Sequence, residues 1–396
     1  MESILEIYKI GYGPSSSHTM GPSIASKKFK EKYANATSYE CILYGSLALT
    51  GRGHLTDYII KKTFAPSEIK ITFDYDTLFD YHPNAMKLIA YKDNKVLGDW
   101  LVFSVGGGSL KELNEERSTF SEKVYPHSQM NEILDYCDQE NITLVEYVKR
   151  FEKPTLDKSL DIIINQMKKT IENGINSTGV LPGRLQVKKR ANDFYNQYLK
   201  EPTRESLVYS YVLASGEENA SGGIVVTAPT CGSCPVVPGV LLSYQKEKSI
   251  PDEEIKNALM ISGLIGNIVK TNASISGAEV GCQGEIGVAC AMAAAGLVYL
   301  QGGNNYDCEY AAEIALEHHL GMTCDPVDGM VQIPCIERNA VAAMQAYNVV
   351  SYVKLAGNEH NITLDDVIQV MKETGKDLHA KYRETSTGGL ATHKRG

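Results

Sequence analysis

Three of the nine cysteines lie where the sequence predicts turns at helix borders. Cys282 lies in "GAEVGCQGEIGVACAM", Cys324 in "GMTCDPVDG" and Cys335 in "QIPCIERN". The glycine, proline and aspartate residues around them give the backbone freedom to turn and N–H donors to offer. The three are too far apart in the sequence for the paired spacing of zinc motifs. Three thiolates from separate loops suit a [4Fe–4S] cluster with one iron free of protein ligands, and the same pattern also fits three buried thiols.

The other six cysteines are typical of a chain from a reducing compartment. Cys231 and Cys234 form a C-x-x-C in "APTCGSCPVVPG", but no thioredoxin-like βαβ pattern accompanies them. We therefore predict a packed, reduced pair rather than a redox site. An odd number of cysteines with no export signal indicates that disulfides are absent. Four cysteines in predicted strands or helices are expected to be small buried residues: Cys41, Cys137, Cys290 and Cys308.

A second candidate site is the hydroxyl-rich loop "GPSSSHTMGPS". Ser15, Ser16, Ser17 and Thr19, with His18 among them, lie at the start of a predicted helix. Backbone N–H groups at a helix N-terminus, with hydroxyls beside them, can bind a carboxylate or a phosphate. Ordinary N-capping explains one hydroxyl well, but three serines with a histidine less well. The composition therefore favours a binding role for this loop.

Two further histidines lie in small, polar surroundings. His54 lies in "LTGRGHLTD", where two glycines allow tight turns, and His82 lies in "YHPNAM" just before a proline. Histidine is the usual general acid or base near neutral pH, so both are catalytic candidates, with a solvated loop histidine as the alternative. The glycines of "VGGGS" do not fit G-x-G-x-x-G, and we expect a plain turn at the end of a strand there.

The elements that must position these residues differ between the two halves of the chain. The first half mixes β-type runs with helical stretches such as 55–64, an α+β pattern. The second half is nearly all helical. We predict an α+β unit over 1–150, a linker over 151–158 around Pro154, and a helical unit over 159–396. The expected strands are 40–47, 68–75, 86–92 and 98–107, and the expected helices are 159–173, 185–199, 206–215, 252–271, 284–300, 307–319, 337–356 and 364–380.

Charge and hydropathy exclude several classes of partner. The formal net charge of −9 argues against a nucleic acid or an anionic membrane. No segment has the length of a transmembrane helix, and "MESILEIYKI" lacks the pattern of a signal peptide. We expect a cytoplasmic protein.

Long strings of the sequence resemble the single-chain iron–sulfur L-serine dehydratases, also called L-serine ammonia-lyases. They occur in the same order from the first dozen residues almost to the end: "GYGPSSSHTMGP", "LYGSLALTGRGHLTD", "GVLPGRLQV", "GGIVVTAPT", "NASISGAEVGCQGEIGVACAMAAAG", "MTCDPVDGMVQIPCIERNA" and "ETGKDLHAKYRETSTGGLA".

The resemblance implies a fold and a reaction. A smaller α+β domain would precede a nearly all-helical domain that holds a [4Fe–4S] cluster, with Cys282, Cys324 and Cys335 as ligands. The reaction would convert L-serine to pyruvate and ammonia without pyridoxal phosphate. The open iron would act as a Lewis acid on the serine hydroxyl. Relatives are commonly homodimers.

The resemblance also distributes roles over the site. His54 is our first choice for the base that removes the Cα proton, with His18 holding the substrate carboxylate or relaying a proton and His82 assisting. The hydroxyls of the loop would fix the carboxylate at the helix end: Ser15, Ser16, Ser17 and Thr19. Four further residues are expected either to support the site or to have a structural role: Asn272, Ser274, Lys381 and Arg383.

Two rival hypotheses stay open at this point. One is an open-iron hydro-lyase that acts on a hydroxy acid or on another small amino acid. The other is a non-enzymatic iron–sulfur sensor, which would usually carry a basic nucleic-acid-binding face that this acidic chain lacks.

Overall fold

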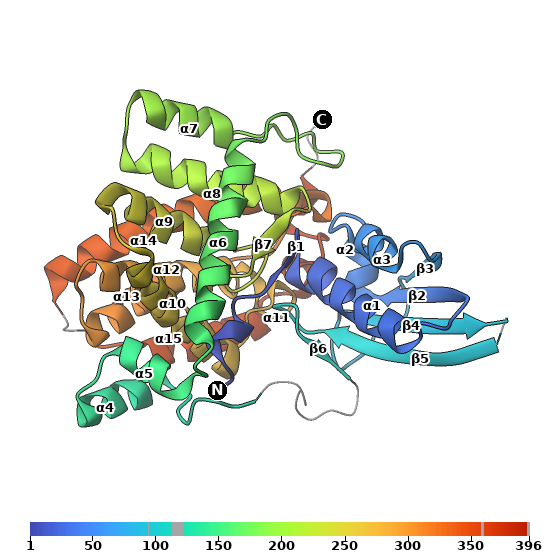
Figure 1. Cartoon of the computed structure of the whole chain (residues 1–396), viewed down its shortest axis with the longest axis horizontal. Helices are drawn as coiled ribbons and strands as arrows, with labels where there is room; N and C mark the ends of the chain where they lie inside the picture. Colours follow the sequence, from blue (N-terminus) through green and yellow to red (C-terminus); the bar gives the residue numbers. More distant parts are fainter. Residues whose placement is uncertain (94, 113–121, 358–359, 394–396) are drawn as a thin grey trace.

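The computed structural model describes residues 1–93, 95–112, 122–357 and 360–393. A five-stranded sheet lies at one end of the molecule in the order β3-β2-β4-β5-β6 (Figure 1). Strand β2 pairs in parallel with β3, and all other neighbours in this sheet are antiparallel. The strands span Ser38–Tyr44 (β2), Ile69–Asp74 (β3), Ala85–Lys92 (β4), Lys95–Ser104 (β5) and Leu110–Lys111 (β6).

One face of this sheet forms a core with the helices α1 (Gly21–Lys32) and α3 (Thr56–Phe64). Buried residues alternate along β2, as the two-residue period of a strand requires, so that Cys41 and Leu43 face the helices. Phe29 of α1 and Phe64 of α3 are fully buried against them. The short helix α2 (Gly45–Thr50) follows β2 directly. We call residues 13–112 the N-terminal unit.

Residues 1–8 pack with the helices of the second half, whereas Tyr12 packs against the core of the sheet. Ile4 and Ile7 are buried in the larger core, and the Tyr8 hydroxyl donates to the Leu259 carbonyl at 2.9 Å. Strand β1 (Ile10–Tyr12) pairs antiparallel with β7 (Ile224–Val226) in a separate two-stranded sheet. We call residues 1–12 with 122–393 the helical unit.

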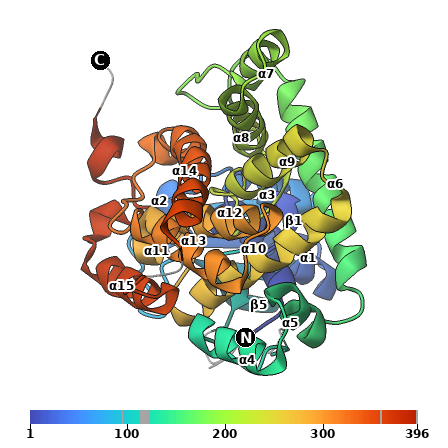
Figure 2. The same cartoon turned by 90° about the vertical axis from the view of Figure 1, so that its left-hand side faces the viewer.

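Helix α12 (Ile286–Leu300) forms the centre of the helical unit, with α9, α10, α13 and α14 packed around it (Figure 2). Its residues from Ile286 to Val298 are all buried, which explains why the sequence is apolar on every side. The surrounding helices are α4 (Met130–Glu140), α5 (Leu144–Phe151), α6 (Leu156–Ile175), α7 (Ala191–Lys200), α8 (Arg204–Ala220), α9 (Val236–Lys248), α10 (Asp252–Asn272), α11 (Gly277–Val280), α13 (Asn305–Glu317), α14 (Cys335–Ala356) and α15 (Leu364–Asp377).

The predicted α+β class is confirmed, and so are the four predicted strands and the helix over 55–64. Helix α9 (Val236–Lys248) was not predicted. Pro235 and Pro238 occupy its N-cap and first turn, where proline is tolerated. The helix predicted over 185–199 begins only at Ala191. The ranges 1–150, 151–158 and 159–396 stay a prediction as domain boundaries, although the side chains of α4 and α5 pack in the larger core.

Among the residues that the structure describes, no single helix has both the length and the hydropathy of a membrane span. Gly277–Gln283 and Ile286–Leu300 reach these values only together, as a pair bent by 53°.

Candidate active site

Side chains from both units line one small cavity. The N-terminal unit contributes Ser15 and His54, from the loop before α1 and from the turn between α2 and α3. The helical unit contributes three cysteines and two glutamates from four separate segments: Cys282, Glu285, Cys324, Cys335 and Glu384. The cavity therefore brings together thiols, carboxylates and an imidazole that lie far apart in the sequence.

The three thiols reach this cavity from turns and from a helix start, as the sequence predicted. Cys282 lies in the 3-10 turn Gly281–Gln283 just before α12, and Cys335 is the first residue of α14. The Cys324 backbone is held by the C-terminal segment, because its N–H donates to the Tyr382 carbonyl at 2.8 Å. The possible ligand atoms of Cys282, Glu285 and Cys324 lie within 4.8 Å of one another.

The three thiols are buried. The neighbouring Cys282 sulfur and burial raise the pKa of Cys324, and burial raises that of Cys335. The guanidinium of Arg338 opposes the rise at Cys335 and pairs with Asp325 at 3.1 Å. These thiols ionise readily only when a cation lies among them, and a bound metal centre supplies that positive charge.

The donor set fits an iron–sulfur cluster with one open iron. Three soft thiol donors converge on one cavity, and the other polar side chains of its lining are Ser15, His54, Glu285 and Glu384. The second carboxylate of the lining, Glu285, already accepts a hydrogen bond from the Thr230 hydroxyl at 2.7 Å. Cysteines outside this set are also reduced and buried, as predicted, including Cys231 and Cys234.

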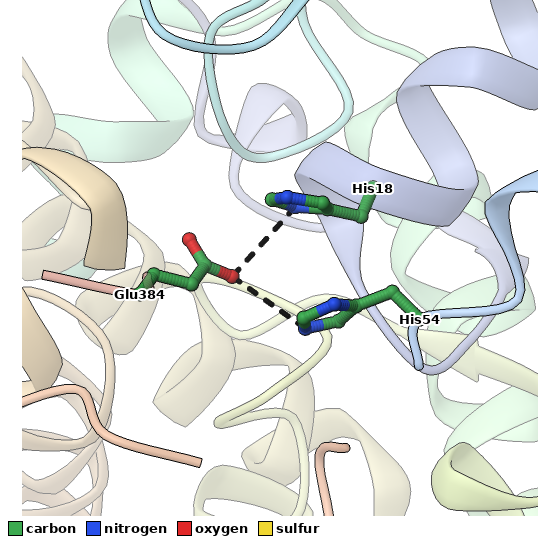
Figure 3. A group of neighbouring side chains, drawn as sticks. All are labelled: His18, His54 and Glu384. Carbon is green, nitrogen blue, oxygen red and sulfur yellow. Dashed lines mark ion pairs between the residues drawn. The ribbon is translucent and has the colours of Figure 1, made fainter. Parts of the chain in front are cut away.

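Two histidines and a glutamate face one another (Figure 3). Two of the three, His54 and Glu384, line the cavity together with the thiols. The rings of His18 and His54 are stacked, with centroids 4.5 Å apart. Glu384 Oε1 lies 3.7 Å from His18 Nδ1 and 3.7 Å from His54 Nε2. All three residues are buried, so a charge on any of them is costly unless a partner offsets it.

Hydrogen bonding fixes the tautomer of neutral His54. Its Nδ1 lies 3.0 Å from the Thr50 carbonyl oxygen, which can only accept, so Nδ1 carries the hydrogen and Nε2 presents a lone pair to the cavity. Both nitrogens of His18 already have hydroxyl partners, with Ser17 Oγ at 2.8 Å from Nδ1 and Ser46 Oγ at 3.1 Å from Nε2. His54 is therefore the better placed base, and His18 the better held ring.

Burial controls the ionisation of this group. It lowers the pKa of His54 to about 4, and burial together with the neighbouring His54 lowers that of His18 well below its usual value. Burial and the charge of Glu285 raise the pKa of Glu384. Both imidazoles are thus neutral near pH 7, which is the state that a general base requires.

His82 is buried near this group but does not line the cavity. Its Nδ1 accepts from the Asn84 N–H at 3.1 Å, and its Nε2, 3.8 Å from Glu279 Oε1, has no hydrogen-bond partner among the described residues. Ser274 Oγ donates to the other oxygen of Glu279. Ser274 and His82 thus both lie next to the Glu279 carboxylate, outside the lining of the cavity.

The hydroxyl-rich loop forms one turn of π-helix, Ser16–Met20, that leads directly into α1. Ser15 is its N-cap and accepts from the His18 N–H at 3.1 Å. The Thr19 hydroxyl donates to the His54 carbonyl at 2.6 Å, which ties the loop to the second histidine. Ser16 and Ser17 are buried beside them. The predicted helix start and the two histidines thus form one structure.

Three predicted residues lie away from the cavity or at its edge. Asn272 donates to the Ser128 and Ile268 carbonyls, which assigns it a structural role at the end of α10. Lys381 is exposed and lies over the Tyr382 ring. Arg383 donates to the Glu279 carbonyl at 3.4 Å, and its Nε is buried without a partner among the described residues.

Sequence reasoning missed Glu285 and Glu384. Both lie in strings that carry the resemblance, three residues after Cys282 and one residue after Arg383. An isolated glutamate in a polar string is usually solvated, so neither had a signal of its own. Only the fold shows that both are directed into a closed site.

Comparison with known proteins gives the same organisation. The family described as serine dehydratase beta chain matches residues 3–67, and serine dehydratase alpha chain matches residues 103–391. Relatives include the L-serine dehydratase of Haemophilus influenzae, 39% identical, covering 99% of each chain. L-serine dehydratase 2 of Escherichia coli is 39% identical over 99% of this chain and 98% of its own, and the L-serine dehydratase of Helicobacter pylori is 41% identical over 98% of each. The chain belongs to the serine dehydratase family, with the regions of the beta and alpha chains joined in one polypeptide.

Proposed function

We propose that this chain is an L-serine dehydratase that converts L-serine to pyruvate and ammonia. The observation that carries the proposal is the cavity that three thiols line together with His54, whose Nε2 presents a lone pair. Relatives that match almost the whole chain bear the name L-serine dehydratase, which supports the same reaction.

We propose that Cys282, Cys324 and Cys335 hold a [4Fe–4S] cluster and that the enzyme does not need pyridoxal phosphate. When bound, such a cluster with one iron free of protein ligands supplies a Lewis acid for the serine hydroxyl. The N-terminus of α14 favours a thiolate at Cys335.

His54 Nε2 takes the Cα proton. The Thr50 carbonyl keeps the ring in the required tautomer by accepting its Nδ1–H. As that proton leaves Cα, the Cα–Cβ double bond forms and hydroxide leaves Cβ, which gives aminoacrylate and, after proton return, water. Aminoacrylate tautomerises to an imine, and water hydrolyses the imine to pyruvate and ammonia. The His18 ring is held by Ser17 and Ser46 and stacks on His54, so it limits the motion of the His54 ring.

The substrate carboxylate is placed at the start of the helix that follows Ser15. The backbone N–H groups of this first turn and the hydroxyls of Ser15, Ser16 and Ser17 supply donors, while Thr19, whose hydroxyl donates to the His54 carbonyl, holds the loop beside the base. His82, with Glu279 and Ser274, supports the rim, and Arg383 holds Glu279 through its carbonyl. We give Asn272 and Lys381 no part in substrate binding.

We further propose a homodimer in the cytoplasm, with L-serine as its small-molecule partner and no nucleic-acid or membrane partner. The net charge of −9 supports the last two points.

One experiment tests the proposal. The chain is purified without oxygen, its absorption spectrum, iron and sulfide are measured, and pyruvate formation is followed with L-serine, L-threonine, L-cysteine and L-glycerate. We expect four irons and four sulfides for each chain and turnover of L-serine above the others. A colourless protein that turns over L-serine would refute the cluster, and a brown protein without lyase activity would refute the reaction in favour of a sensor.

A further inference from the structure

Arg338 connects the two segments that carry Cys324 and Cys335. It lies on α14, three residues after Cys335, and its side chain is 20% exposed. Its Nη1 donates to the Thr323 carbonyl at 2.7 Å, and its Nη2 pairs with Asp325 Oδ1 at 3.1 Å. Thr323 and Asp325 are the residues directly before and after Cys324. One guanidinium group therefore holds the chain on both sides of this cysteine.

The Asp325 carboxylate is itself fixed from several directions. It is buried, and its Oδ1 also accepts from the Thr323 hydroxyl at 3.1 Å. Its Oδ2 accepts from the Leu390 N–H at 2.8 Å. A carboxylate whose two oxygens both have donors keeps one orientation, so it presents Oδ1 to Arg338 in a defined direction.

Arg338 is placed to hold a cysteine rather than to bind substrate. An arginine beside a site for a small acid commonly pairs with the carboxylate of the ligand. Arg338, however, is not among the described residues that line the cavity, and both of its Nη atoms already have protein partners. Its influence on the site therefore passes through the thiols that it holds.

The placement of Cys324 relative to α14 depends on this contact. Cys335 is the first residue of α14, and residues three apart on a helix share a face, so Arg338 moves with Cys335. The backbone bonds of Cys324 lead elsewhere, because its N–H donates to the Tyr382 carbonyl at 2.8 Å and its carbonyl accepts from the Glu384 N–H at 2.9 Å. Those two bonds fix Cys324 to the C-terminal segment, whereas Arg338 fixes it to the helix of the next thiol.

We propose that Arg338 is a positioning residue that sets the distance between Cys324 and Cys335 and so keeps the metal centre bound. The inference rests on the proposed function, because it takes both cysteines as cluster ligands. Iron leaves a centre when a ligand moves away from it, so a Cys324 loop that is free to shift should release iron faster. Partners that hold metal ligands in place contribute roughly 10- to 100-fold to metal affinity.

The test follows loss of iron from the loaded enzyme and does not depend on turnover. The full chain, purified without oxygen and loaded with iron and sulfide, is mixed with an excess of a ferrous chelator, and both the chelate and the brown absorption are followed with time. The proteins compared are wild type, Arg338→Met, Arg338→Lys and Arg204→Met. Arg204 is the matched control, since it makes a two-point contact with the Glu247 carboxylate, at 2.9 and 3.0 Å, and does not line the cavity.

We expect Arg338→Met to release iron roughly 10- to 100-fold faster than wild type. Arg338→Lys keeps the charge, but one ammonium nitrogen cannot replace the two-point contact of a guanidinium, so its rate should lie between those of wild type and Arg338→Met. Arg204→Met also breaks an ion pair, yet its rate should stay within about twofold of wild type, because a remote site acts independently.

Release from folded Arg338→Met at the wild-type rate would overturn the inference. Equally fast release from Arg204→Met would also overturn it, since iron loss would then follow from a general loss of stability. If Arg338→Met does not fold, Arg338→Lys decides in its place, and release at the wild-type rate would again overturn the inference. A wild type that holds iron but does not turn over L-serine would refute the proposed reaction and leave the result on Arg338 standing, whereas a wild type that binds no iron would overturn both.

Discussion

Gly53 offers a direct test of how closely the two units must be placed. It lies in the turn that carries His54, and an added Cβ would come 2.8 Å from the Gly329 carbonyl oxygen and 2.9 Å from that of Asp328. These are backbone atoms of the helical unit, so no side chain can move aside. Replacing Gly53 with alanine must therefore push the His54 turn away from the loop that follows Cys324.

The size of the effect follows from these distances. Ordinary contacts of a Cβ begin near 3.4 Å, so the turn must move by about half an ångström. A misplacement of 1 Å can cost about 100-fold in rate, which predicts a loss of roughly tenfold in kcat/KM for Gly53→Ala. Overpacking of this kind should also lower the free energy of unfolding by about 1–3 kcal/mol.

The assay is pyruvate formation from L-serine by anaerobically purified variants with matched iron content. Gly302→Ala is the control, because it forces an alanine to φ +84° in a remote turn with nothing within 4 Å. It should cost about 1 kcal/mol of stability and leave kcat/KM unchanged. Full activity in Gly53→Ala would refute the argument that backbone contact between the units sets the position of His54.

Three further changes probe the ligands, the base and a remote carboxyl. Replacing any proposed cluster ligand (Cys282, Cys324 or Cys335) with serine should remove both the brown absorption and turnover, whereas Cys137→Ser should remove neither. A variant that stays coloured and active would exclude the replaced cysteine as a ligand. His54→Ala should lower kcat by roughly a hundredfold or more with iron content unchanged; if exchange of the Cα deuteron persists, the base lies elsewhere. Burial and the neighbouring Glu317 and Glu309 raise the pKa of Glu313 from 4.5 to about 8. Between these pH values the folded state keeps a proton that the unfolded state has lost, so the free energy of unfolding falls as the pH rises. Glu313→Gln should therefore raise the free energy of unfolding by roughly 2–4 kcal/mol at pH 8 and by little at pH 4.5, as chemical denaturation would measure; equal gains at both pH values would contradict this.

Local patterns in the sequence predicted the elements well, because their causes are local. The alternation along β2 and the apolar run of α12 follow from the periods of strands and buried helices. The cysteine turns and the helix start after Ser15 were also predicted from neighbouring residues, and the structure places them where those residues indicate.

Long-range packing was not predictable from these patterns. Nothing near Ile10 indicates that it pairs with Val226, and nothing near Glu384 indicates that two histidines of the other unit will enclose it. His82 looked equivalent to His54 in the sequence, yet it faces Glu279 at the rim while His54 faces the thiols. Such differences depend on which segments the fold brings together.

The chain connectivity explains how such a site can be held in register. The N-terminal unit begins at a point held by the helical unit, because β1 pairs with β7 just before Gly13. At Gly13 an added Cβ would meet Asn219 atoms at 2.2 and 2.5 Å, and Asn219 donates to the Pro14 carbonyl at 3.0 Å. The loop from Ser15 to His18 thus starts from a point fixed on α8 of the helical unit. Glu384 approaches from the opposite side on a segment bound to Cys324, through its N–H to the Cys324 carbonyl at 2.9 Å. The loop beside His54 and the Glu384 segment are consequently both anchored to the helical unit, which carries the thiols. The distances from His54 and Glu384 to the thiols are therefore not set by the five-stranded sheet alone.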